Sequence, residues 1–90
     1  MKPTDKRALA VAFRVVFIER MNDLGLTVDA MADACGLSPH TIRMYRSHSR
    51  ETVPGMDVFA DIAKGLRLTE RTLYARVRHE RDALLFGRVV

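Results

Sequence analysis

The stretch from residue 27 to residue 47, TVDAMADACGLSPHTIRMYRS, decides the fold of this chain. Gly36 divides it into two short segments, since glycine tolerates the positive φ of a tight turn. Ser38 suits the N-cap of the second segment, because its hydroxyl can accept from the free N–H groups of a first turn. Pro39 follows at the first helical position, where a missing N–H has no consequence. The stretch therefore predicts two short helices joined by a turn.

The apolar positions of this stretch meet the demands of a steep helix–helix angle. Ala32 is small enough for the closest approach of the two helices, and Leu37 can fill the elbow after Gly36. Ile42 and Tyr45 are three positions apart, so they share the inward face of the second helix. Together these features predict a helix-turn-helix, whose second helix enters the major groove in DNA-binding proteins.

Three further helices are expected from apolar residues that recur at steps of three and four. The expected ranges are about 5–23, about 56–66, and a helix that begins after the cap Thr69. The end of the last helix is not defined by the sequence, and a short edge strand over 84–90 is an alternative. We predict an all-α domain of five helices over 1–77, with a short C-terminal extension over 78–90.

Composition places the chain in a broad class. Ninety residues suffice for one modest core, and the hydrophobic fraction of 48% excludes a wholly disordered chain. No apolar run is long enough to cross a bilayer, and the N-terminus lacks the cleavage site of a signal peptide. The single cysteine, Cys35, cannot form an internal disulfide, which fits a reducing compartment. We expect a cytoplasmic protein.

Basic residues are unevenly distributed. The formal net charge is +4, and there is no acidic residue between Asp33 and Glu51. From Lys64 to the end, seven lysines and arginines accompany three acids. Basic side chains gathered in one segment are the expected footprint of a nucleic-acid contact face.

The sequence resembles the lambda-repressor-like, or Xre/Cro, family of helix-turn-helix regulators. The similarity extends over about residues 6–77. It implies five helices, a homodimer on a palindromic DNA operator, and a regulatory role common in phages, plasmids and bacteria. The pattern departs from the family at Val28, where glutamine is usual, and at Pro39, where a polar side chain often contacts a base. The matching segments are DLGLT (23–27), MADACGLS (31–38), TI (41–42), IAKGL (62–66) and LT (68–69).

The family orientation gives the third helix a base-facing side, with Arg43 as the candidate for a bidentate contact to guanine. A second group of residues is expected to hold phosphates, which fixes the register on the duplex without recognising its sequence. The base-facing candidates are Ser38, Pro39, His40, Arg43, Met44 and Ser47, and the phosphate candidates are Thr27, Thr41, Arg46, Ser49 and Arg50.

The apolar C-terminal end is not explained by the motif. Such residues either fold back on the core or meet a second subunit, and the resemblance favours dimerisation through Leu84, Leu85, Phe86 and Val89. The same tail could bind a protein partner, as in an antitoxin that also regulates its own promoter. Two further alternatives are a protein-interaction module without DNA binding and an RNA-binding protein.

The sequence gives no sign of an enzyme, a cofactor or a metal. Cys35, His40 and His48 do not have the spacing of a structural zinc site and lack a fourth ligand. Cys35 falls on the inward face of its helix, so we expect a small core residue. No side-chain pair has the context of a catalytic nucleophile and its base.

Overall fold

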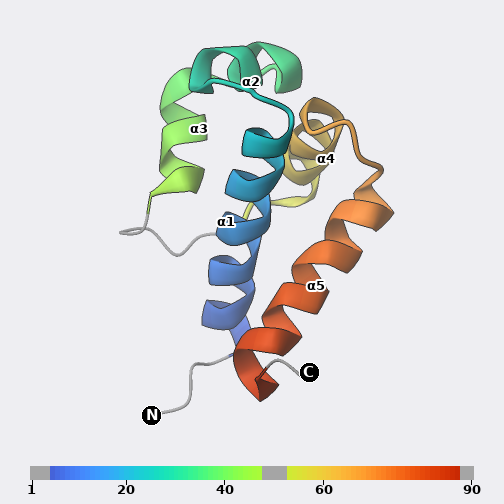
Figure 1. Cartoon of the computed structure of the whole chain (residues 1–90). Coiled ribbons are helices and arrows are strands. Elements are labelled where there is room, and N and C mark those ends of the chain that lie inside the picture. Colours follow the sequence, from blue (N-terminus) through green and yellow to red (C-terminus); the bar gives the residue numbers. More distant parts are fainter. Residues whose placement is uncertain (1–4, 48–52, 88–90) are drawn as a thin grey trace.

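The computed structural model describes residues 5–47 and 53–87, and its ordered elements are all helices. The prediction of an all-α fold with five helices is confirmed for these residues, which contain no strand. The helices are α1 (Asp5–Asp23), α2 (Val28–Cys35), α3 (Pro39–Arg46), α4 (Met56–Gly65) and α5 (Glu70–Phe86) (Figure 1).

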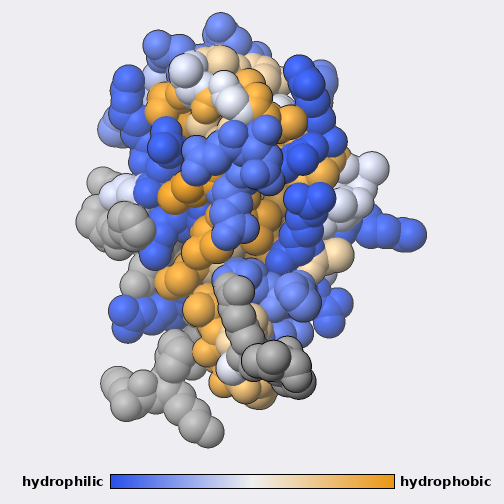
Figure 2. All heavy atoms as spheres, in the orientation of Figure 1, coloured by the Kyte–Doolittle hydropathy of each residue, from blue (hydrophilic) through white to orange (hydrophobic). Residues whose placement is uncertain are grey.

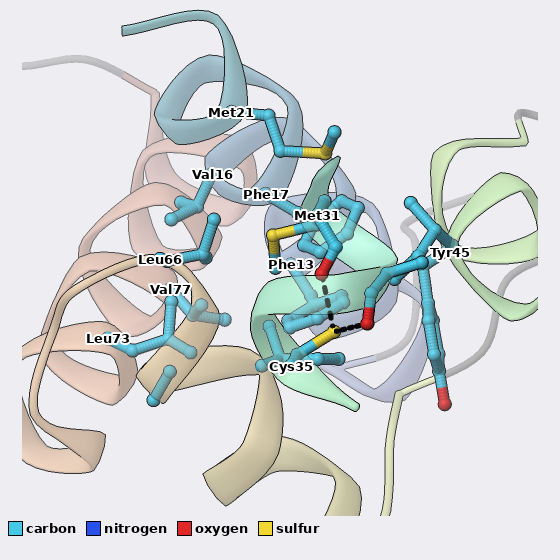
Figure 3. Packing of buried hydrophobic residues seen from close by; sticks show 14 of the residues in the cluster. Phe13, Val16, Phe17, Met21, Met31, Cys35, Tyr45, Leu66, Leu73 and Val77 are labelled. Atoms are coloured by element: carbon cyan, nitrogen blue, oxygen red, sulfur yellow. Dashed lines mark hydrogen bonds between the residues drawn. The ribbon is translucent and has the colours of Figure 1, made fainter. Parts of the chain in front are cut away.

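Helix α1 is the centre of the bundle. Figure 1 shows α3 on one side of α1 and α5 on the other, with α2 across one end. Phe13, Phe17 and Met21 of α1 are at most 1% exposed and face the other helices (Figure 3). Leu73 and Val77 of α5 are also buried. Burial of these apolar side chains is the main force that holds the helices together.

The surface of α1 is less polar than that of an ordinary amphipathic helix. Val11, Val15 and Ile18 point away from the buried face and are only half-buried. Figure 2 shows hydrophobic atoms along the middle of one face of the molecule, where α1 lies between more hydrophilic flanks. Apolar residues therefore surround most of α1 and do not form a single stripe.

Helices α2 and α4 approach each other closely at Gly65. A Cβ built on Gly65 would lie 2.9 Å from Cβ of Cys35 and 3.1 Å from Cε of Met31. No side chain fits there without displacing α2. Gly65 therefore sets the distance between α4 and the helix that precedes α3.

Helix α5 continues to Phe86 without interruption. The alternative of an edge strand is wrong for residues 84–86, because the backbone remains helical until Gly87. Residues 88–90 lie outside the described part. The expected boundary after residue 77 falls inside this helix. In the ranges 5–47 and 53–87, no helix is long and apolar enough to cross a membrane.

Candidate nucleic-acid interface

The turn between α2 and α3 is built by local chemistry. Thr27 caps α2, and its Oγ1 accepts a hydrogen bond from the Ala30 N–H at 3.1 Å. Gly36 adopts φ of 72°, in the left-handed region that glycine enters without steric cost. The Leu37 N–H then donates to the Ala32 carbonyl at 3.0 Å. These bonds fix the direction in which the chain enters α3.

The first turn of α3 is capped as expected. The Ser38 Oγ accepts from the Thr41 N–H at 3.2 Å, and the Ser38 and Thr41 hydroxyls share a second hydrogen bond at 2.9 Å. Pro39 occupies the first helical position. These features begin α3 at a defined residue and leave the N-terminal end of the helix at the surface.

Two buried side chains fix the rotation of α3. Ile42 is 0% exposed and Tyr45 is 9% exposed. The Tyr45 ring packs edge-on against Phe13 and Phe17 of α1, with centroid distances of 5.7 and 6.3 Å. Burial raises the pKa of the Tyr45 hydroxyl, which Figure 3 shows at the edge of the cluster. The opposite side of α3 is thereby turned to solvent.

The base-facing candidates are partly collected on this outward side. Ser38, Pro39, His40 and Arg43 are exposed, whereas Ser47 is half-buried. Met44 is also half-buried and packs against the core, so its side chain is less outward than the sequence suggested. The exposed set combines hydroxyl, imidazole and guanidinium groups, and α3 carries no acid. Such a surface can donate to base edges and to phosphates.

The phosphate candidates flank this surface. Thr27 is exposed at the start of α2, and Thr41 and Arg46 are half-buried on α3. Ser49 and Arg50 lie outside the described residues. The Thr27 and Thr41 hydroxyls already serve the caps, and each retains capacity for a further hydrogen bond.

The C-terminal candidates lie at the far end of α5. Leu84 is 44% exposed and Phe86 is 80% exposed. Leu85 is half-buried, and Val89 lies outside the described residues. Two large apolar side chains are therefore open to solvent in the single chain, at a place well separated from α3 (Figure 1).

Cys35 is a core residue, as its helical position predicted. Its Sγ donates to the Met31 carbonyl at 3.0 Å, and the side chain is 6% exposed (Figure 3). Burial raises the pKa of the thiol. Burial thus favours the protonated form of this thiol.

Sequence reasoning did not find three features of the α4–α5 region. Arg67 adopts φ of 58° between the helices, although left-handed backbone favours glycine. The Arg20 Nε donates to the Leu66 carbonyl at 3.0 Å and closes the end of α4 from α1. The sequence showed the charge of Arg71, Arg76 and Arg78, but it did not predict that they form an exposed basic surface on α5. Only the alternation of arginine with Tyr74 could have indicated one.

Comparisons of the chain with protein-family models, with curated proteins and with solved structures find no match.

Proposed function

We propose that the chain is a sequence-specific double-stranded DNA-binding transcriptional regulator, a repressor that acts as a homodimer on a palindromic operator. In this proposal α3 lies in the major groove with its N-terminal end toward the bases. We also propose that the chain has a lambda-repressor-like fold and that it acts in the cytoplasm. The observation that carries it is α3 itself, which Ile42 and Tyr45 anchor and which presents Ser38, His40 and Arg43.

Charge supports a duplex as the partner. The segment between Asp33 and Glu51 contains basic residues and no acid, so phosphates meet no opposing carboxylate from it. Arg43 projects from the middle of α3 and is our candidate for direct base recognition. Arg46, one turn from Ile42, is our candidate for a phosphate contact.

The proposal is tested by binding of labelled duplexes to variants with matched charge changes. Arg43→Ala should weaken binding to the preferred duplex by about 10- to 100-fold, since a bidentate base contact contributes roughly 1–3 kcal/mol. Arg46→Ala should weaken all duplexes alike and lower the salt dependence by about one counterion. Arg76→Ala, which removes an exposed arginine of α5, is the control and should change little.

Survival of duplex binding in the Arg43→Ala, Arg46→Ala double variant would refute the groove assignment. Strong binding to structured RNA without binding to duplexes would favour the RNA alternative instead. If the chain binds neither duplex DNA nor RNA, the result would favour the alternative of a protein-interaction module.

Exposed Leu84 and Phe86 support the homodimer. Replacement of both by serine should shift the chain toward monomer in sedimentation analysis, because it removes the apolar surface that a second subunit would cover. Met56→Ser is the control, since Met56 is 88% exposed and lies elsewhere on the molecule. A dimer unchanged by the Leu84 and Phe86 substitutions would place the interface on another surface.

A further inference from the structure

A cleft of about 390 Å³ lies between α1, α5 and the start of α4. Phe13 and Val77 in its lining are at most 2% exposed. Val53, Met56 and Tyr74 also line it and are 40%, 88% and 50% exposed. Large apolar side chains are thus open to solvent around a hollow with a buried apolar base, as in the anchor pockets of protein interfaces.

Two arginines of α5 accompany this cleft, one in its lining and one beside it. Arg71 lines it, and the guanidinium of Arg78 lies 5.8 Å from the centre of the Tyr74 ring. Arg71, Tyr74 and Arg78 are spaced by three and four residues, so they form one row along the helix. Arg71 and Arg78 make no ion pair with a described residue. Glu70 is the one acid among the described residues of the lining.

We propose that this cleft binds an acidic amphipathic segment of a partner protein. A leucine or aromatic side chain of the partner fills the apolar hollow beside Tyr74, and its carboxylates pair with Arg71 and Arg78. Arginine beside an aromatic ring suits such a contact, because the guanidinium can stack on the ring and bind a carboxylate. The arrangement is that of an amphipathic helix in a groove with a charged rim.

Charge favours an acidic peptide segment in the cleft over two other candidates, a second copy of this chain and a DNA duplex. A second copy offers Leu84 and Phe86 as apolar anchors, but residues 83–90 contain an arginine and no acid, so like charges would meet. A DNA duplex supplies negative charge but no side chain for the hollow. An acidic apolar segment satisfies both features of the cleft.

The cleft is distinct from the proposed DNA-binding surface. Figure 1 shows α5 and α3 on opposite sides of α1, so a protein partner and a duplex can bind together. The proposal therefore does not depend on DNA binding.

The test is an NMR titration of the isotope-labelled 90-residue chain with three synthetic peptides of about 14 residues. The first has leucines at helical spacing and glutamates elsewhere. The second replaces the glutamates by lysines, and the third replaces the leucines by alanines. The first should bind with a dissociation constant of about 10–100 µM, and the other two should show none below about 1 mM. The amides that shift should lie in residues 71–78 and in the parts of α1 and α4 that line the cleft.

Two arginines of α5 supply a matched pair of variants. Arg78→Glu should weaken binding of the acidic peptide by about tenfold or more, whereas Arg76→Glu should change it by less than about twofold. Arg76 has the same charge and exposure class, but it lines the opposite side of the helix. Tyr74→Ala should also weaken binding, and Glu70→Gln should strengthen it. Thermal unfolding of each variant establishes that it is folded.

Three results would overturn the proposal. The first is that the acidic peptide does not bind. The second is that Arg76→Glu and Arg78→Glu weaken its binding equally. The third is that the alanine peptide binds as tightly as the leucine peptide. The last two would show attraction by net charge alone. Each is independent of whether the chain binds a duplex.

Discussion

Helices α3 and α5 carry similar charge but differ in what accompanies it. Helix α3 is short, its apolar side chains face inward, and its exposed side is polar and basic. Helix α5 is twice as long and exposes Tyr74, Leu84 and Phe86 among its arginines. A polar basic face suits phosphates and base edges, whereas a basic face with apolar anchors suits a protein. Both helices are net positive, and the groups that accompany the arginines are the reason that we propose a different kind of partner for each.

The largest expected effect concerns the anchor of α3. Ile42→Ala should lower the free energy of unfolding by about 2–5 kcal/mol, because it opens a cavity at a site with 0% exposure. Leu84→Ala, at a side chain of α5 that is 44% exposed, should cost less than about 1 kcal/mol. Urea unfolding measures both. Both values apply to the monomer, at low protein concentration, and equal losses there would contradict this account. A larger loss for Leu84→Ala at high concentration is what the proposed homodimer predicts.

The contact that holds α2 in place should give the next effect. Gly65→Ala should destabilise the protein by about 1–3 kcal/mol, since the new Cβ would meet Cβ of Cys35 at 2.9 Å. Adding Cys35→Gly should recover part of this loss, so that the double variant costs less than the sum of the two singles. If the two losses of unfolding free energy add exactly, the strain in Gly65→Ala does not arise from its contact with Cys35.

The turns that precede the two helices differ in a way that can be tested. Gly36 before α3 and Arg67 before α5 both have positive φ. Gly36→Ala should cost about 1 kcal/mol, because alanine is strained there although nothing crowds the site. Arg67→Gly should be neutral or stabilising by up to about 1 kcal/mol, since it relieves the same strain. Thermal unfolding compares them, and a loss for Arg67→Gly as large as that for Gly36→Ala would contradict this account.

The smallest expected effect is a loss of stability at alkaline pH, caused by two buried groups in and near α3. Burial raises the pKa of Cys35 above 9.0 and that of Tyr45 above 10.0. A group whose pKa is raised on folding gives stability that is complete below its unfolded pKa and is lost as pH rises through the folded value. The free energy of unfolding should therefore fall above about pH 9. Tyr45→Phe and Cys35→Ala should flatten that fall, and an unchanged slope in both would exclude these groups as its source.

Local chemistry explains why the α2–α3 region could be predicted from sequence. Gly36, Ser38 and Pro39 each act within a few residues, so the end of α2 and the start of α3 followed from them. The inward positions of Ile42 and Tyr45 followed from helical periodicity.

Tertiary contacts explain what the sequence did not show. The cleft combines side chains from α1, α4 and α5 that are far apart in the chain. The left-handed Arg67 goes against its own preference, and backbone hydrogen bonds hold this turn: the Arg67 N–H donates to the Lys64 carbonyl and the Leu68 N–H to the Ala63 carbonyl. Met44 lies at an outward helical position, yet its long side chain reaches the core, and periodicity alone does not report that reach.

The most direct test of the proposed function is selection of bound duplexes from a random pool at two salt concentrations. The account predicts a palindromic consensus with half-sites about one helical turn apart, enriched at both concentrations. Binding that selects no sequence and disappears at the higher concentration would contradict it, because phosphate attraction alone behaves in that way.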